Sequence, residues 1–125
     1  MIALGVPSEV SVTKLKKSIV DFLRRHPGST FAELCREVPG FAGSAIMGTA
    51  YPNLIIWRGV SPEAIRALEL LEKGRMVRFE ATTVHPYGQE GREIGLPASF
   101  KAQACETPHW LPVLLHATRT PKRTG

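Results

Sequence analysis

The most informative stretch of this sequence is SPEAIRALELLEKGRMV, residues 61–77. Ser61 is a favoured helix N-cap, and Pro62 suits the first helical position because its missing N–H would have no helical partner there. Gly74 is a residue type that commonly ends a helix. The residues that share one side of a helical wheel are Ala64, Ile65, Ala67, Leu68 and Leu71. We therefore predict an amphipathic helix that buries this apolar side.

The opposite side of this predicted helix is mostly polar. Its outward residues are Pro62, Glu63, Arg66, Glu69 and Lys73, with Leu70 among them. Two interpretations of Leu70 are open: the core extends further around the helix, or a partner covers that side chain.

The residues after this helix predict strands. Residues 76–81 alternate between apolar and polar, as in a half-buried strand. His85–Arg92 is dense in turn-forming residues, so we expect a hairpin tip or an extended loop there, with Glu93–Leu96 as the returning strand. Trp110–Leu115 predicts a last strand, which Pro112 confines to an edge or a bulge.

The residues before Ser61 are less regular. Asn53–Trp57 is a continuous apolar run that predicts a strand buried on both faces or nearly so, and Arg58-Gly59 is its expected end. Gly40–Tyr51 is small and rich in glycine. A poor helical turn and a loop both fit that segment, and the sequence does not choose between them.

Two further helices are predicted near the N-terminus. Thr30-Phe31-Ala32-Glu33 has the spacing of a capping box, in which the Thr hydroxyl and the Glu carboxylate each accept a backbone N–H. Its expected buried residues are Phe31, Leu34, Cys35 and Val38, and Pro39-Gly40 ends it. An earlier helix is expected from Ser11, as N-cap, to His26, with Val12, Leu15, Ile19, Phe22 and Leu23 as its apolar stripe.

Residues 61–77 resemble the third helix and first wing strand of winged helix-turn-helix proteins, and residues 30–40 resemble the second helix of that family. The similarity covers roughly residues 11–82. It implies an α+β, winged-helix-like fold with a three-helix core and a small antiparallel β-sheet. We expect residues 1–117 to form one such domain and residues 118–125 to form a basic, disordered tail. Residues 38–61 depart from the family, which joins its second and third helices by a tight turn.

The net charge of +5 is concentrated at the two ends of the chain. Residues 1–28 hold five Lys or Arg against two Asp or Glu, and residues 112–125 hold three basic residues and no acidic one. No apolar run approaches the roughly 20 residues of a membrane-spanning helix. The first residues lack the basic start of a secretory signal, so a cytoplasmic protein is expected.

The resemblance implies DNA binding, with a transcriptional regulator as the expected class and a homodimer as its expected form. The residues expected to face the major groove are Ser61, Glu63, Arg66 and Lys73, and those expected to reach phosphates are Arg75, Arg78, His85 and Arg92. Attraction to DNA phosphates that does not depend on base sequence is expected from Lys14, Lys17, Arg24 and Arg25 and, in the tail, from Arg119, Lys122 and Arg123.

A protein-interaction module without DNA binding is the alternative. Glu63 and Glu69 offset Arg66 and Lys73 on the predicted third helix, so that helix offers phosphates little net charge. An outward Leu70 favours a protein partner. The aromatic residues that would serve either as anchors or as core are Trp57, Tyr87, Phe100 and Trp110.

An enzyme is not expected from this sequence. The histidines are scattered at residues 26, 85, 109 and 116, and Asp21 is the only aspartate. The sequence has no phosphate-binding loop and no dinucleotide fingerprint, so no cofactor is expected. Cys105 and His109 are four apart, but no second pair of ligands completes a zinc site.

Overall fold

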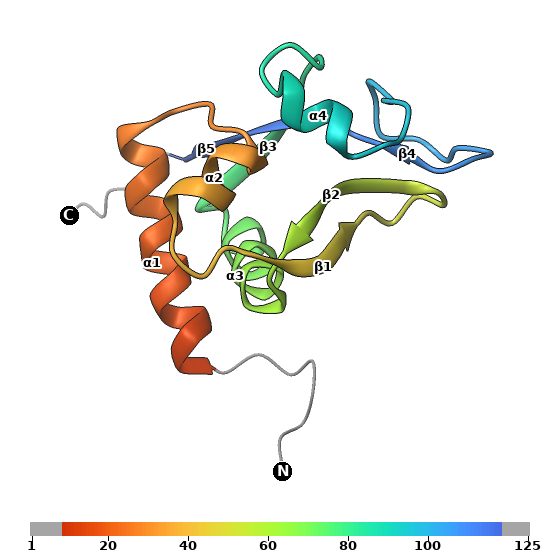
Figure 1. The fold of residues 1–125 in the computed structure, drawn as a ribbon. Helices are drawn as coiled ribbons and strands as arrows, with labels where there is room; N and C mark the ends of the chain where they lie inside the picture. Colours follow the sequence, from red (N-terminus) through yellow and green to blue (C-terminus); the bar gives the residue numbers. More distant parts are fainter. Residues whose placement is uncertain (1–8, 119–125) are drawn as a thin grey trace.

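A computed structural model describes residues 9–118 as an α+β protein (Figure 1). Its elements are α1 (Glu9–Arg25), α2 (Phe31–Glu37), β1 (Ala42–Gly48), β2 (Leu54–Val60), α3 (Pro62–Lys73), β3 (Val77–Ala81), α4 (Gln89–Glu93), β4 (His109–Trp110) and β5 (Val113–Ala117). None of the helices in this part of the chain is both long enough and apolar enough to cross a bilayer.

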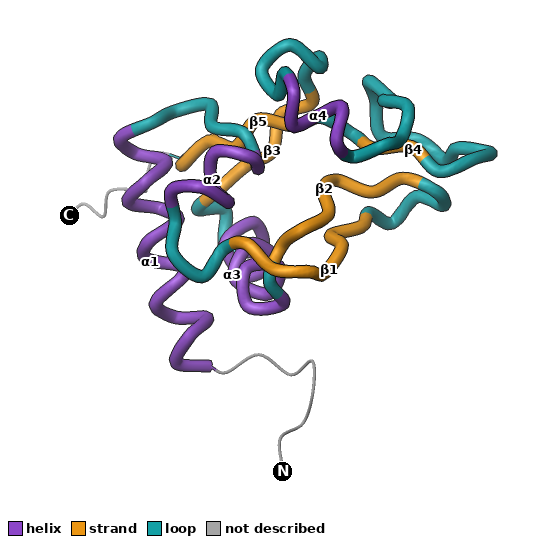
Figure 2. Tube along the Cα trace, in the orientation of Figure 1, coloured by secondary structure: helices purple, strands orange, loops and turns teal. Residues whose placement is uncertain are grey.

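The strands form two small sheets (Figure 2). One has the order β1-β2-β4, in which β2 pairs antiparallel with β1 and parallel with β4. The other pairs β3 with β5 in a regular antiparallel ladder, and Ser29 adds a single bridge to Leu115 of β5. The expected single antiparallel sheet is thus replaced by two sheets, which the chain connects between β4 and β5 at Pro112.

α1 and α3 supply much of the core as predicted. Val12, Leu15, Ile19, Phe22 and Leu23 are all buried, so the predicted stripe of the first helix is confirmed. The predicted N-cap is wrong, however. α1 already includes Glu9, so Ser11 lies within the helix.

The N-terminus of α2 confirms the capping box. The Thr30 hydroxyl accepts from the Glu33 backbone N–H at 3.0 Å, and a Glu33 carboxylate oxygen accepts from the Thr30 N–H at 2.8 Å. Phe31, Leu34 and Val38 are buried. Cys35 is only half-buried, and this burial raises the pKa of its thiol above the ordinary value.

Residues 42–48 form the strand β1, so neither the helical turn nor the loop considered for this segment is correct. Gly43 explains the unusual composition, because a Cβ added there would lie 2.6 Å from the Ser61 Cα and 2.8 Å from the Ser61 backbone N. The small residues of this segment therefore permit close packing. Arg58-Gly59 does not end the next strand as predicted, since β2 continues to Val60 with Gly59 at a φ of 97°.

α3 confirms both the predicted start at Ser61 and the predicted stop at Gly74. Ser61 is the N-cap and its hydroxyl accepts from the Ala64 N–H at 3.0 Å. Gly74 caps the C-terminus with a φ of −82°, so the left-handed position falls instead on Arg75, with a φ of 60°. Leu70 is half-buried and packs against the core. The core therefore extends around α3, and Leu70 is not the exposed apolar residue that a partner would need to cover.

The predicted hairpin after β3 is wrong. His85–Arg92 contains a turn followed by most of α4, and Glu93–Leu96 forms no strand. The antiparallel partner of β3 is β5, which comes much later in the chain. The predicted last strand is divided at Leu111 and Pro112, which separate β4 from β5.

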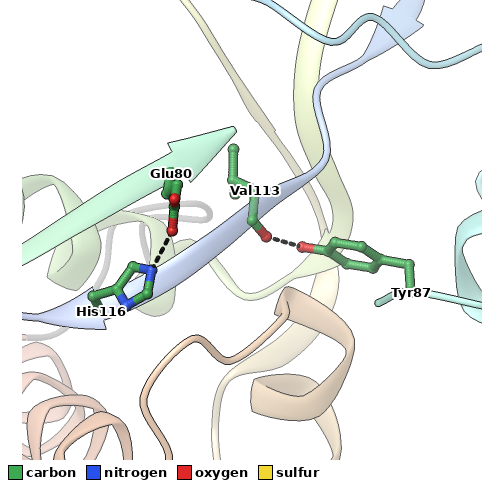
Figure 3. A network of polar contacts seen from close by, with 4 residues as sticks. All are labelled: Glu80, Tyr87, Val113 and His116. Atoms are coloured by element: carbon green, nitrogen blue, oxygen red, sulfur yellow. Dashed lines mark hydrogen bonds and ion pairs between the residues drawn. The ribbon is translucent and has the colours of Figure 1, made fainter. Parts of the chain in front are cut away.

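A buried aromatic cluster holds α4 and the loop before it against the rest of the core. Tyr87 packs against Trp57 and Trp110 with ring centroids 4.9 and 5.1 Å away. Its hydroxyl donates to the Val113 carbonyl at 2.7 Å (Figure 3) and accepts from the Phe31 N–H at 3.0 Å. Burial raises the pKa of Tyr87 above its ordinary value, so the phenol stays protonated. Of the four predicted anchors, only Phe100 is exposed.

Candidate nucleic-acid interface

The N-terminal end of α3 does not present the side chains that the recognition-helix hypothesis placed there. Ser61 is 7% exposed, and its hydroxyl donates to the Gly40 carbonyl at 2.6 Å while capping Ala64. Its predicted outward position is therefore wrong, because both hydrogen-bonding directions serve the fold. Glu63 is half-buried and lines a hollow between α3 and α1 together with Lys14.

The exposed side of α3 is balanced in charge. Arg66 lies 3.8 Å from the Glu69 carboxylate, and both side chains are more than half exposed. Glu72 is also exposed on this helix. The Glu69 carboxylate beside Arg66 and the negative charge of Glu72 weaken the attraction of this side for DNA phosphates.

The predicted phosphate contacts are separated by the length of β3. Arg75 and Arg78 are exposed at the turn before β3 and on β3 itself. His85 and Arg92 are also exposed, but they lie in and after the loop that follows the opposite end of this strand (Figure 1). The structure thus does not bring the four residues together as one wing surface.

The face of the sheet that carries Arg78 also carries a hydrogen bond between a histidine and a carboxylate. His116, the cross-strand partner of Arg78, has its Nε2 2.7 Å from the Glu80 carboxylate (Figure 3). The Glu80 carboxylate would oppose a phosphate at this face, so Arg78 is a less favourable contact than the exposed basic residues nearer α1.

A groove between α1 and the end of α3 gathers basic side chains more effectively. It has a volume of about 460 Å³, and its lining residues are Thr13, Lys16, Lys17, Val20, Asp21, Arg24, Leu71 and Met76. We call it the basic groove. Lys17 is 3.2 Å from Asp21, with 80% of the lysine side chain exposed, so this pair is largely solvated.

Lys73 and Arg75 are exposed and lie in the chain between Leu71 and Met76, which line this groove. The turn that carries them is well defined. The Met76 N–H donates to the Leu71 carbonyl at 2.8 Å and the Arg75 N–H to the Glu72 carbonyl at 3.0 Å, which is the pattern of a Schellman motif. The left-handed position of that motif usually belongs to glycine, and here it is Arg75.

The C-terminal end of the described chain is held at the same turn. The Thr118 N–H donates to the Met76 carbonyl at 2.9 Å, and its hydroxyl donates to the Arg75 carbonyl. The predicted tail residues Arg119, Lys122 and Arg123 lie outside the described residues. Thr118, the last described residue, is thus held beside Met76, which lines the basic groove.

No match exists for this chain among protein-family models, curated protein sequences or solved structures. Across residues 9–118, no cluster of three or more His, Cys, Asp or Glu side chains could hold a metal ion.

Sequence reasoning identified Lys17 and Arg24 as basic surface but missed Lys16, which is half-buried in the same groove. Lys16 and Val20 are four residues apart on α1, a spacing that places both on one side of a helix. That spacing was a usable signal. The contribution of Leu71 and Met76 had no comparable signal, because it depends on how α1 and α3 pack.

Proposed function

We propose that this protein binds double-stranded DNA through the basic groove, using contacts to phosphates more than contacts to bases. The observation that carries the proposal is that Lys16, Lys17 and Arg24 line one groove with Leu71 and Met76, between which the chain carries the exposed Lys73 and Arg75. Lysine and arginine side chains gathered along one surface neutralise phosphates and release bound counterions.

A winged-helix frame is part of the same proposal. The order of α1, α2 and α3 followed by β3, and the antiparallel pairing of β3 with β5, support it. Two features modify that frame: the β1–β2 hairpin stands between α2 and α3, and residues 82–112 separate the strands of the final pair. Because α2 and α3 are not joined by a tight turn, we place phosphate contact ahead of base reading.

Direct base reading is less well supported by the side chains of α3. Ser61 is buried, and Arg66 is close to the Glu69 carboxylate. Lys73 and Arg75 also interact favourably with the negative end of the helix dipole, so their presence alone has a purely structural explanation. An experiment must therefore separate binding from stability.

The experiment measures the affinity for a fluorescent duplex of roughly 20 base pairs, about two helical turns, over a range of salt concentrations. With five phosphate contacts, log K falls with log salt with a slope of about −4.5, which corresponds to a loss of roughly 500-fold between about 50 and 200 mM salt. Lys16→Gln should make the slope less steep by about 0.9. A slope near zero in the unmodified protein contradicts the proposal.

Two further variants fix the location of the contact. Asp21→Asn removes a carboxylate from the groove and should strengthen binding, by about fivefold for a repulsion of roughly 1 kcal/mol. Lys101→Gln removes an exposed charge from the loop before β4 and should leave the slope unchanged. If Lys101→Gln weakens binding as much as Lys16→Gln does, the basic groove is not the contact surface. A second, unrelated duplex of equal length should bind with similar affinity.

A further inference from the structure

A second groove lies between the two sheets, on another side of α3. It has a volume of about 760 Å³ and is lined by residues of β1, β2, α3 and β3, together with part of the segment from residue 102 to residue 113. We call it the inter-sheet groove. α3 contacts both β1 and β3, and therefore bridges the two sheets beneath it (Figure 2). The basic groove contains none of its lining residues.

The walls of the inter-sheet groove are mainly apolar and partly open to solvent. Ile56 and Met47 are buried within it, whereas Ile46 is 55% exposed and Tyr51 is 44% exposed. Exposed large apolar side chains that line one concave surface favour a binding site.

Two strand edges border this groove. β1 and β3 each have a strand partner on one side only within residues 9–118. The pairing of β1 with β2 contains several register shifts, which make an edge a poor template for another strand. The ladder between β3 and β5 is regular along its whole length. β3 is therefore the better template.

On the free edge of β3, the unpaired backbone groups come from the same residues whose side chains line the groove. The Thr82 N–H donates to the Pro112 carbonyl and the Met76 carbonyl accepts from Thr118, so even-numbered residues direct their backbone groups toward β5. Because these directions alternate along a strand, the backbone groups of Phe79 and Ala81 point toward the free edge. The Phe79 and Ala81 side chains line the groove.

The charge of the groove is complementary to a basic ligand. Its charged side chains are Glu69 and Glu72, which lie with Ile65 at the spacing of one helical face. A strand added to β3 would place its alternate side chains about 5 Å from those of Phe79 and Ala81, above this stripe of α3. The stripe offers an apolar contact at Ile65 and carboxylates at the other two positions.

We propose that the free edge of β3 binds an extended peptide segment of a partner protein as an additional strand, with apolar and basic side chains of that segment in the inter-sheet groove. Backbone hydrogen bonds to Phe79 and Ala81 fix the position of the segment. Ile65 contacts its apolar side chains, and Glu69 and Glu72 bind its lysine or arginine side chains.

The probe is a synthetic peptide of alternating valine and lysine with both termini blocked, added to the full chain labelled with 15N. Peptide binding should shift the amide resonances of β3 more than those of β1, because the peptide backbone pairs with β3 and only its side chains approach β1. A peptide with N-methyl groups on consecutive central amides lacks donors on both edges and should not bind. A peptide of alternating valine and glutamate should bind at least about fivefold more weakly.

Three variants test the geometry. Ala81→Pro removes a donor that the ladder with β5 does not use, so the fold should persist and peptide binding should be lost. The double substitution Glu69→Gln and Glu72→Gln should weaken binding by about fivefold or more. Glu80 lies on the opposite face of β3, so Glu80→Gln should leave the affinity for the peptide unchanged.

Four results would overturn the proposal. The first is the absence of amide shifts at about 1 mM peptide, a concentration far above the dissociation constants of specific complexes. The others are shifts confined to β1, unchanged peptide binding by the Ala81→Pro variant, and equal binding of the N-methylated peptide. Shifts of β3 amides that depend on protein concentration, without peptide, would assign the edge to a second copy of this chain and would also overturn it. None of these measurements uses DNA, so their outcome is independent of the function proposed for the basic groove.

Discussion

Replacing Arg75 with glycine should stabilise the protein and weaken DNA binding at the same time. Arg75 has a φ of 60°, a left-handed conformation that costs a residue with a Cβ about 1 to 2 kcal/mol. Glycine avoids that cost but gains about 0.4 to 1 kcal/mol of conformational freedom in the unfolded chain. The net gain in the free energy of unfolding should therefore be about 0.5 to 1 kcal/mol, which raises Tm by about 2 to 5 °C.

The same substitution removes one predicted phosphate contact. The slope of log K against log salt should become less steep by about 0.9, which corresponds to roughly fivefold weaker binding at about 0.15 M salt. Fluorescence anisotropy with a labelled duplex measures the slope, and thermal unfolding without DNA measures the stability.

Arg75→Ala is the matched control, because it removes the same charge and keeps the Cβ. It should lose the same affinity as Arg75→Gly without the gain in Tm. A lower Tm for Arg75→Gly than for Arg75→Ala would refute the conformational reasoning. An unchanged salt slope in both variants would refute the role of Arg75 in phosphate contact, whatever happens to their stability.

Two further predictions concern the core. Tyr87→Phe leaves a buried N–H and a buried carbonyl without their partner and should cost about 2 kcal/mol, with Tyr51→Phe, at an exposed position, as the neutral control. Burial raises the pKa of Tyr87, so the phenol stabilises the fold fully below about pH 10 and this stabilisation is lost as pH rises further. The difference in free energy of unfolding between the unmodified protein and Tyr87→Phe should therefore become smaller in alkaline solution. Gly43→Ala should lower the free energy of unfolding by about 1 to 3 kcal/mol in chemical denaturation, because the new Cβ meets the Ser61 backbone. Gly48→Ala is the control and should be neutral, because no atom lies within 4 Å of its Cβ. Equal costs for the two substitutions would contradict this reasoning.

Local signals in the sequence predicted the helices well. The Ser61 cap with Pro62 and the pair Thr30 and Glu33 involve residues close together in the chain, so the pattern contains the whole interaction. The apolar stripe of α1 was similarly readable, because helical periodicity alone identifies a buried side.

The strands were less predictable because their partners are distant. Turn-forming residues around Tyr87 suggested a hairpin tip, but its hydroxyl bonds to Phe31 and Val113, 56 and 26 positions away, and these contacts bury the segment. Gly43 suggested an irregular segment because nothing in the sequence shows that Ser61 lies against it.

The candidate site was predictable only in part. The exposed positions of Lys73, Arg75 and Arg78 follow from the predicted helix and strand, and the structure agrees. Ser61 is expected to face DNA because the resemblance places the start of the third helix in the major groove, but the approach of Gly40 and Gly43 buries it. The basic groove depends on the packing of α1 against α3, which composition does not encode.

The late position of β5 affects how the protein folds during synthesis. β5 pairs with β3 and also bridges to Ser29, so two distant segments depend on residues 113–117 for their pairing. While those residues are still inside the ribosome, a nascent chain can form its helices but leaves β3 and Ser29 without their pairing partner. This sheet can therefore form only after residues 113–117 have left the ribosome, and shortened chains that end before Val113 should remain sensitive to proteases and available to chaperones.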